Sequence, residues 1–255
     1  MLAAIDIGNS RLKWALFDGT ALRGAGAVTT VADCLEALAA EADAPSAVAL
    51  APTGSPEHAQ ALLSGAGERW PGVPRFVART RARCAGLVNA YQDPATMGVD
   101  RWLAMVEAWS TVRLPVCVVD AGTAVTVDAV DGAGQQLGGL IIPGQALMMG
   151  SLARSTARVG AHAATDAVPR WGRSTGACVE AGSVAAIRGA VREAVAGFRA
   201  DFQDGRVFLT GGDRGLLHGA VHAGDDSVTI DPVLVLRGLE RCWRLGQLDA
   251  AGGTP

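Results

Sequence analysis

Aromatic residues, cysteine and long apolar runs are all scarce in this sequence, and each shortage excludes a class of protein. Aromatic side chains make up only 5% of the 255 residues, so the core must be mainly aliphatic. No apolar run approaches the roughly 18 residues of a membrane-spanning helix. The first residues also lack the basic and apolar segments of a secretion signal. We therefore expect a soluble, cytoplasmic protein with no membrane partner.

Cysteine is sparse, and its spacing argues against a structural use. The five cysteines are odd in number, and no two of them form a Cys-x-x-Cys pair. Thiols scattered in this way neither build a disulfide framework nor hold zinc. We expect reduced thiols, most of them buried, at Cys34, Cys84, Cys117, Cys178 and Cys242.

Charge of either sign is limited and evenly spread. The chain carries 22 basic and 25 acidic residues, a net charge of −3, and this balance argues against a nucleic-acid partner. The most basic stretch, Arg79 to Arg83, has two interpretations: a solvated loop, or a segment that attracts an anionic nucleotide. The hydrophobic fraction of 49% excludes disorder, and the length allows one large domain or two smaller ones.

The first informative stretch is Leu2 to Phe17. An apolar run reaches Asp6, a polar turn follows at Gly8-Asn9-Ser10, and apolar residues then alternate around Lys13. This alternation predicts a strand with one buried face, so the whole stretch predicts a hairpin. The backbone N–H groups of such a turn, with a hydroxyl and an ammonium group, can hold phosphate. Asp6 can anchor a hydrated metal ion.

The same pattern returns at Val116 to Val130. An apolar run ends at Asp120, a turn follows at Ala121-Gly122-Thr123, and a second strand is expected from Val125. Two copies of this pattern indicate an internal duplication. Both resemble the phosphate loops of the superfamily of acetate kinases, sugar kinases, actin and heat-shock ATPases. The resemblance implies an α/β fold, with two ribonuclease-H-like domains of mixed β-sheets flanked by helices and a nucleotide cleft between them.

The order of the expected elements agrees with this fold class. We expect a domain over residues 1–114 that carries the first phosphate loop, and a domain over 115–255 that carries the second loop and the adenosine side. Residues 154–174 are expected to form a loop at the cleft, and 252–255 to fray. Strands are expected at residues 2–5, 12–16, 21–28, 46–51, 73–78, 116–120, 125–130, 135–142 and 206–210. Helices are expected at residues 30–41, 57–66, 99–109, 145–153, 175–200 and 231–245.

The segment from Tyr91 to Trp109 begins as a loop and continues from Val99 with the apolar stripe of a helix. Asp100 therefore lies in the first turn, where the helix dipole stabilises a carboxylate. Arg101 lies at the same positive end, where a cation is unfavourable. We expect an anionic partner for Arg101, either a carboxylate in a structural ion pair or a bound anion.

Five motifs follow one another between residue 1 and about residue 185. They are Asp6-x-Gly8-Asn9-Ser10-x-x-Lys13, Gly98-Val99-Asp100-Arg101 after Tyr91 and Pro94, Asp120-Ala121-Gly122-Thr123-Ala124-x-Thr126-x-Asp128, Gly138-Gly139-Leu140-Ile141-Ile142-Pro143-Gly144, and Gly172-Arg173-Ser174-Thr175 with Glu180-Ala181-Gly182. As an ordered set they resemble the motifs of the type III pantothenate kinases. Ser10 stands where that family often has threonine, which keeps the hydroxyl. The resemblance implies transfer of the γ-phosphate of ATP to the primary hydroxyl of pantothenate, giving 4′-phosphopantothenate in the first step of coenzyme A biosynthesis.

The resemblance also implies roles for individual residues. Asp100 would be the catalytic general base, and Arg101 would bind the pantothenate carboxylate. Gly211-Gly212-Asp213 would lie at the adenosine pocket. The implied ATP-binding residues are Asp6, Ile7, Gly8, Asn9, Ser10, Arg11, Leu12, Lys13 and Thr123. The implied substrate-binding residues are Tyr91, Gly98, Val99, Asp100, Arg101 and Thr175.

The resemblance also implies two cations that bind together with ATP. Asp120 would coordinate a monovalent cation, K⁺ or NH₄⁺, and Asp6 would hold Mg²⁺ through water. The residue chemistry alone leaves open a second Mg²⁺ at Asp120. It also leaves open a purely structural carboxylate held by the N–H groups of its own turn.

Other functions on the same scaffold stay open at this stage. An accessory transcriptional regulator is the main alternative, and the presence of both Lys13 and Asp100 favours the enzyme over it. A different sugar or acetate-type kinase is a third possibility, which the GxDR and GRST segments make weaker. The resemblance also implies a homodimer that pairs through the second domain and places the acceptor pocket near the subunit interface. The long helix from Thr175 is apolar enough to support this pairing, but a helix buried within one chain would show the same pattern.

Overall fold

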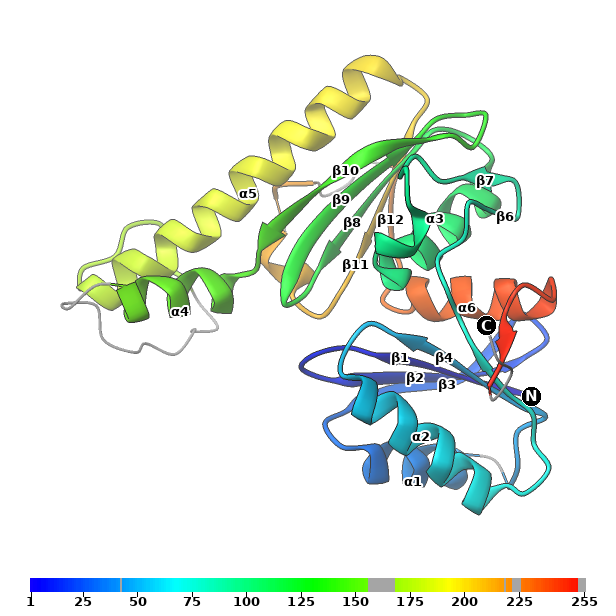
Figure 1. Cartoon of the computed structure of the whole chain (residues 1–255). Coiled ribbons are helices and arrows are strands. Elements are labelled where there is room, and N and C mark those ends of the chain that lie inside the picture. The colour runs from blue at the N-terminus through cyan, green and yellow to red at the C-terminus, as the bar shows by residue number, and fades with distance from the viewer. Residues whose placement is uncertain (42, 156–167, 218, 222–225, 252–255) are drawn as a thin grey trace. The chain divides into compact units, whose positions relative to one another are not determined.

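The computed structural model describes residues 1–41, 43–155, 168–217, 219–221 and 226–251, which fold into two compact units. Unit 1 comprises Met1–Arg113, Ala133–Gln136 and Val233–Pro255. Unit 2 comprises Leu114–Gly132 and Leu137–Pro232. Each unit is built on its own β-sheet with helices packed against it (Figure 1).

The sheet of unit 1 has six strands in the order β13-β5-β4-β1-β2-β3. The central strand β1 pairs antiparallel with β2 and parallel with β4. All six residues of β1 are buried, which is why the sequence shows a continuous apolar run there instead of an alternating one. The strands are β1 (Leu2–Ile7), β2 (Leu12–Asp18), β3 (Ala21–Val28), β4 (Ala47–Pro52), β5 (Arg75–Val77) and β13 (Asp249–Ala250).

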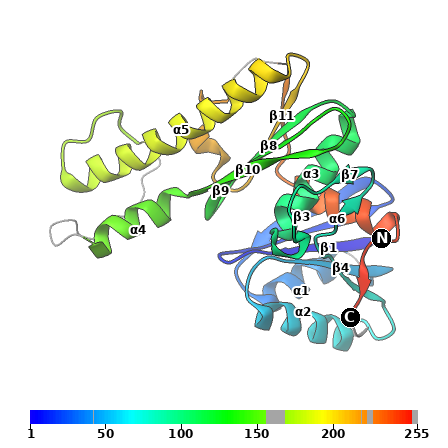
Figure 2. The same ribbon diagram turned by 45° about the horizontal axis from the view of Figure 1, so that its top comes forward.

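Helices cover both faces of this sheet (Figures 1 and 2). Helices α1 (Val31–Glu41) and α2 (Pro56–Arg69) pack on one face. Helix α6 (Leu234–Arg244) packs on the other face, and α3 (Val99–Val112) packs on α6. Between α2 and α3 lie the short strands β6 (Arg83–Cys84) and β7 (Leu87–Val88) and the 3₁₀ turn η1 (Pro94–Thr96).

Side-chain caps mark where α1 and α2 begin. The hydroxyl of Thr30 accepts a hydrogen bond from the backbone N–H of Asp33 across 3.1 Å. Ser55 caps α2 in the same way, because its side chain accepts from the N–H of His58, and proline follows it at the first helical position. Thr30 is therefore the residue that caps α1.

The sheet of unit 2 has five strands in the order β10-β9-β8-β11-β12. Helix α5 (Thr175–Asp201) packs on this sheet through its second half. Helix α4 (Gln145–Ser155) lies beside α5, as both views show. The remaining elements are β8 (Val116–Ala121), β9 (Ala124–Val130), β10 (Gln136–Pro143), β11 (Arg206–Thr210), β12 (Val228–Ile230) and η2 (Arg214–Leu217).

The two sheets share one strand order. Numbered within each unit, both run third, second, first, fourth, fifth strand, as β3-β2-β1-β4-β5 and as β10-β9-β8-β11-β12. In both, the first strand pairs antiparallel with the second and parallel with the fourth. The expected fold class, α/β with two mixed-sheet domains flanked by helices, is confirmed.

The two units are divided differently from the expected ranges 1–114 and 115–255 at the C-terminal end and at residues 133–136, which belong to unit 1. The first segment of unit 1 ends at Arg113. From Val233 onward, however, the chain belongs to unit 1, because α6 packs on α3 and on the unit 1 sheet. Residues 156–167, most of the expected cleft loop, and 252–255, the expected frayed end, lie outside the described residues.

Candidate active site

The first candidate phosphate loop joins β1 to β2. Gly8 donates its backbone N–H to the carbonyl of Arg11 across 3.1 Å, which closes the turn. Asn9, Ser10 and Arg11 are exposed on it. Ile7 and Leu12 point into the core, so of these two residues only backbone groups could reach a nucleotide.

Asp6 lies inside β1, one residue before this strand ends at Ile7. Its carboxylate is buried, and Lys13 faces it from β2 with 3.9 Å between Nζ and Oδ2. The hydroxyl of Thr53, after the parallel strand β4, lies 3.4 Å from Asp6 Oδ1. A buried carboxylate at a strand end, with a lysine ammonium group and a hydroxyl beside it, is suited to a phosphate and its hydrated cation.

Thr53 and Gly54 support this loop, and sequence reasoning missed both. The N–H and the hydroxyl of Thr53 both donate to the carbonyl of Ile7, at 3.1 and 2.9 Å. A Cβ at Gly54 would lie 2.6 Å from the carbonyl oxygen of Gly8. A glycine two residues after an apolar strand was the available signal, but nothing local in the sequence pairs it with a residue 46 positions earlier.

The second candidate phosphate loop joins β8 to β9. Asp120 is half-buried in β8, and Gly122 donates its N–H to the carbonyl of Ala124 across 2.9 Å. Thr123 is exposed at the turn, and its carbonyl accepts from the N–H of Gly144 across 3.0 Å. The residue that precedes α4 therefore holds this turn in place.

Gly211 stands against the second loop as Gly54 stands against the first. It has φ +94°, and a Cβ there would approach the carbonyl oxygen of Ala121 and the carboxylate of Asp120 well within 3.0 Å. Asp213 donates its N–H to the carbonyl of Ala121 across 2.9 Å. The two units therefore share one arrangement: the carbonyl of the residue after the aspartate accepts a backbone N–H from the segment that follows the neighbouring parallel strand. In each unit a glycine in that segment lets the two backbones come close.

The candidate acceptor segment lies in unit 1, at the start of α3. Gly98 caps the helix without a side chain, and the half-buried Asp100 accepts the N–H of Arg101 at Oδ1 across 2.8 Å. The buried guanidinium of Arg101 donates to the hydroxyl of Tyr91 across 3.0 Å. Tyr91, Asp100 and Arg101 are therefore brought together, whereas the side chain of Val99 is buried in the core.

The loop that carries Tyr91 is held by polar side chains that sequence reasoning did not single out. Asn89 accepts the N–H of Tyr91 at Oδ1 across 2.8 Å. The buried Gln136 accepts the N–H of Ala90 across 3.1 Å. Thr80 donates to the carbonyl of Met97 across 2.8 Å, just before α3 begins. These contacts fix the position of Tyr91 relative to Arg101. The anionic partner expected for Arg101 stays a prediction.

Thr175, the remaining predicted substrate residue, is the first residue of α5 in unit 2. Its side chain is exposed, and the preceding Ser174 caps the helix by accepting the N–H of Ala177 across 3.2 Å. Gly172 packs so closely on this first turn that a Cβ there would overlap the backbone of Ala177 and Cys178. The GRST segment is therefore a tight capped turn that presents Thr175 to solvent.

The basic segment from Arg79 to Arg83 has structural partners. Arg79 pairs with Asp249 of β13 across 3.1 Å, and Arg81 pairs with the same carboxylate. Arg81 also donates to the carbonyl of Gln247 across 3.1 Å. Two of its three arginines thus connect this segment to the C-terminal strand, which favours a structural role over capture of a nucleotide.

The residues of the site that could bind a cation are mainly oxygen donors. Among the described residues, no group of three or more His, Cys, Asp or Glu side chains could hold a metal ion. Asp6 and Asp120 each stand at a phosphate loop, and a single carboxylate suits Mg²⁺, which keeps several waters and binds phosphate oxygens. The residues present therefore fit a cation held jointly by one carboxylate, water and nucleotide.

In the same described ranges, no helix is long and apolar enough to cross a membrane.

Comparison with known proteins identifies the family. The family model described as type III pantothenate kinase matches residues 2–197. A type III pantothenate kinase of Thiobacillus denitrificans is 40% identical over 248 residues, covering 95% of this chain and 96% of its own. One of Marinobacter nauticus is 36% identical over 256 residues, covering 97% and 100%.

A solved structure agrees at the level of the fold. The crystal structure of a conserved putative Baf family transcriptional activator from Campylobacter jejuni aligns with a TM-score of 0.58 at 20% identity, covering 96% of this chain and 98% of that one. At this identity the likeness concerns the fold alone. The sequence matches, in contrast, extend along nearly the whole chain, and the chain belongs to the type III pantothenate kinase family.

Proposed function

We propose that this type III pantothenate kinase transfers the γ-phosphate of ATP to the primary hydroxyl of pantothenate, giving ADP and 4′-phosphopantothenate. Family membership supports the activity, and one observation supports the site. Tyr91, Asp100 and Arg101 converge in the same unit that carries the Asp6–Lys13 loop. ATP and reduced thiols support a cytoplasmic location.

Positioning and charge neutralisation carry most of the catalysis in phosphoryl transfer. In our proposal, the backbone N–H groups of the Gly8–Arg11 turn and the ammonium group of Lys13 bind the phosphates. Thr123 contacts them from the other hairpin. Asp100 orients the acceptor hydroxyl and takes its proton, and the loose transition state makes a strong base unnecessary.

Arg101 binds the carboxylate of pantothenate in this proposal. Its planar guanidinium can donate two parallel hydrogen bonds to the two carboxylate oxygens. The hydrogen bond to Tyr91 supports the role, because it fixes the guanidinium in a buried position where a charged group needs partners. Gly98 leaves the helix start uncovered by a side chain, and Thr175 adds a hydroxyl from α5.

Two cations complete the proposed site. Asp6 would hold Mg²⁺ through water, and Asp120 would coordinate a monovalent cation, K⁺ or NH₄⁺. When bound, these ions neutralise the phosphate oxygens. The position of both carboxylates at the ends of equivalent strands, each beside a phosphate loop, supports the pair of sites.

We also propose a homodimer that forms through unit 2. Strand β10 is an edge of its sheet, and it exposes apolar side chains that include Ile141 at 64%. Such an edge in a stable protein is usually covered. A groove of about 550 Å³ between α4 and α5, lined in part by Leu147 and Leu152, continues the apolar surface. The exposed apolar residues of β10 and α4 are Leu137, Leu140, Ile141, Leu147 and Leu152.

Sedimentation tests the dimer. We expect the wild-type chain to sediment at twice 26.0 kDa at micromolar concentration, and Ile141→Glu to shift it toward the monomer. The exposed Ile230, on β12 at the opposite edge of the sheet, is a matched control, and Ile230→Glu should leave the dimer intact. A wild-type monomer would exclude the proposal.

A coupled assay of ADP release tests the activity. It contains ATP and Mg²⁺, with and without pantothenate, in K⁺ and in Na⁺ buffer. We expect turnover that requires pantothenate and K⁺, and a loss of about 10²–10⁴-fold in kcat for Asp100→Asn, the usual contribution of a general base. Asp33→Asn is the matched control, because Asp33 is an exposed aspartate in the first turn of α1 and should leave the rate unchanged.

The same assay decides between the kinase and the regulator. A regulator on this scaffold would bind nucleotide without turnover. Folded wild-type protein that binds ATP and releases no pantothenate-dependent ADP in either buffer would exclude our proposal and favour the regulator or another acceptor. An Asp120→Asn variant tests the cation site, since it should lose the difference between K⁺ and Na⁺ along with most of the rate.

A further inference from the structure

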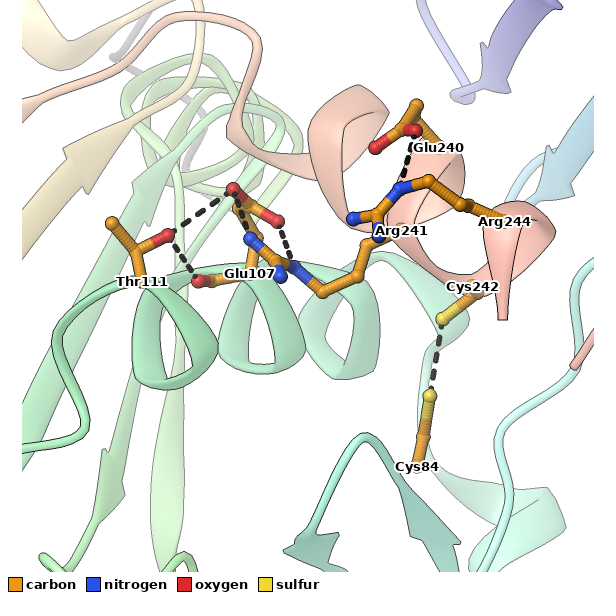
Figure 3. Close-up of polar contacts among 7 residues, drawn as sticks. All are labelled: Cys84, Glu107, Thr111, Glu240, Arg241, Cys242 and Arg244. Carbon is orange, nitrogen blue, oxygen red and sulfur yellow. Dashed lines mark hydrogen bonds and ion pairs between the residues drawn. The ribbon is translucent and has the colours of Figure 1, made fainter. Parts of the chain in front are cut away.

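Two buried cysteines that no phosphate or acceptor motif includes lie side by side in unit 1. The sulfur atoms of Cys84 and Cys242 are 3.2 Å apart, and both side chains are buried. Cys84 is on β6 and Cys242 is on α6, 158 positions later in the chain (Figure 3). The sequence suggested no pairing, because neither cysteine belongs to a Cys-x-x-Cys motif.

Polar contacts hold Cys242 in place. The neighbouring Arg241 donates to both carboxylate oxygens of Glu107 on α3, at 2.6 and 3.1 Å. Thr111 donates to Glu107 as well, as Figure 3 shows. This ion pair joins α6 to α3 and so holds the part of α6 that carries Cys242. The packing of unit 1 therefore places the two sulfur atoms close together.

The surroundings of the pair differ from those of the other buried thiols. The hydrogen bond with Cys242 lowers the pKa of Cys84, and the positive charges of Arg81 and Arg241 act in the same direction, while burial opposes them. By contrast, burial raises the pKa values of Cys34 and Cys117 to about 12. Since the thiolate is the reactive form, Cys84 is the nucleophile of the pair.

We propose that Cys84 and Cys242 form an oxidation site, at which hydrogen peroxide converts the two thiols into a disulfide between β6 and α6. The Cys84 thiolate attacks the peroxide and becomes a sulfenic acid, with release of one water. The Cys242 thiol then attacks the sulfenic sulfur, the S–S bond forms, and a second water leaves. Two thiols are oxidised by two electrons and one peroxide is reduced by two, so the step balances.

The local structure allows the sulfurs to meet and a small oxidant to enter. A disulfide bond is about 2.05 Å long, so the two sulfurs must approach by roughly 1 Å. Cys84 lies in a hairpin whose strands have only two residues each and whose turn, Ala85-Gly86, has φ +52° and +95°. A short hairpin of this kind moves and opens locally more easily than the six-stranded sheet.

The bond would constrain a large part of the chain. It closes a loop of 158 residues, and long closed loops restrict the unfolded chain most in the entropic account. It would also fix the hairpin that leads into Asn89 and Tyr91 against α6. We therefore expect the oxidised protein to unfold a few degrees higher than the reduced protein.

The experiment counts thiols in the full-length chain. Cys178→Ser serves as the background, because Cys178 is the exposed cysteine and its removal prevents links between molecules. The protein is treated with hydrogen peroxide or with dithiothreitol, denatured and alkylated, and its mass is measured. We expect four alkylated thiols after reduction and two after oxidation, a Cys84–Cys242 peptide in the digest, and return to four on reduction. These readouts require no catalytic activity.

Variants identify the pair. Cys84→Ala should keep three alkylated thiols after peroxide, and Cys242→Ala should stop at the Cys84 sulfenic acid with no linked peptide. Cys117→Ala, the matched buried control, should instead fall from three alkylated thiols to one. Four alkylated thiols after oxidation of the background protein would overturn the proposal, as would a linked peptide with another cysteine, or Cys84 converted to sulfinic acid without a link. The background protein alone gives these outcomes, so a variant that fails to fold does not weaken the test. An oxidised protein that unfolds below the reduced one would contradict the geometry.

Discussion

Arg101 donates a hydrogen bond from Nη1 to the hydroxyl of Tyr91, ten residues earlier, across 3.0 Å. The guanidinium carbon also lies 5.8 Å from the centroid of the tyrosine ring, within the range of a cation–π contact. The only tyrosine of the chain thus orients a buried cation at the first turn of α3. Beside that cation lies Asp100, whose Oδ1 accepts the N–H of Arg101.

Tyr91→Phe removes the hydroxyl but keeps the ring. One hydrogen bond to a charged group contributes about 1.5–3 kcal/mol, so we expect the KM for pantothenate to rise roughly 10-fold, while kcat changes less than about twofold. Steady-state kinetics with pantothenate varied at saturating ATP measure both quantities. The KM for ATP is the internal control and should stay constant. A fall in kcat with an unchanged KM would show that the pair does not position the acceptor.

Gly211→Ala should destabilise the second phosphate loop. Its φ of +94° is strained for alanine, and the new Cβ would overlap the carbonyl of Ala121. We expect a loss of about 2–4 kcal/mol in the free energy of unfolding. Gly212→Ala, at the next position with no atom within 4 Å of the new Cβ, is the matched control and should cost less than about 0.5 kcal/mol. Urea unfolding compares them, and equal losses would contradict the packing argument.

Gly238→Ala tests the contact between α6 and α3. A Cβ at Gly238 would approach the carbonyl oxygen of Leu103 far within 3.0 Å, so the two helices must separate. We expect a loss of about 1–3 kcal/mol, because overpacking a core has this cost. Gly189→Ala in α5 has open space around the new Cβ. It should instead stabilise by about 0.5–1 kcal/mol, since alanine is the better helix former. A stabilising Gly238→Ala would show that the helices are not in contact here.

The Arg241–Glu107 ion pair should show strong coupling in a double-mutant cycle. Both side chains are largely buried, so Glu107→Gln or Arg241→Met alone leaves a buried charge without its partner and should cost about 3 kcal/mol. The double variant should cost less than the sum of the two single losses. Chemical unfolding at neutral pH measures the cycle, and additive losses would show that the pair is not coupled.

The pH dependence of this contribution has a defined sign. The hydrogen bond with Glu107 raises the pKa of Arg241 above the ordinary value of an arginine side chain. A raised pKa on a base stabilises the folded state below the unfolded value, and the contribution is lost only as the pH rises through the folded value. We therefore expect the contribution of the Arg241 charge to be constant across the neutral range.

Local sequence patterns predicted the elements of the fold well. The strand at residues 21–28 was predicted to the residue, and α5 was predicted within one residue at its end. The two hairpins that carry Asp6 and Asp120 were predicted as a repeated motif because in each an apolar run ends near an aspartate and is followed by a glycine turn. Those signals lie within a few neighbouring residues.

The supports of the candidate site could not be predicted in the same way. Gly54 against Gly8, Gln136 against Ala90, and Asp249 against Arg79 join residues far apart in the sequence. An apolar helix face does not specify its partner, so α6 was expected with the second domain and packs in the first. Strands β6, β7 and β13 have two residues each, too few to show a period.

The place of α6 has a consequence for how the chain folds during translation. A ribosome completes β5 at Val77, but α6, the helix that covers one face of the sheet, begins only at Leu234, after 156 further residues. At typical rates of synthesis this interval lasts roughly 8 to 31 seconds. Throughout it, the apolar face of the nascent sheet is a surface for chaperones. The unit that the ribosome begins first is therefore the one that it finishes last.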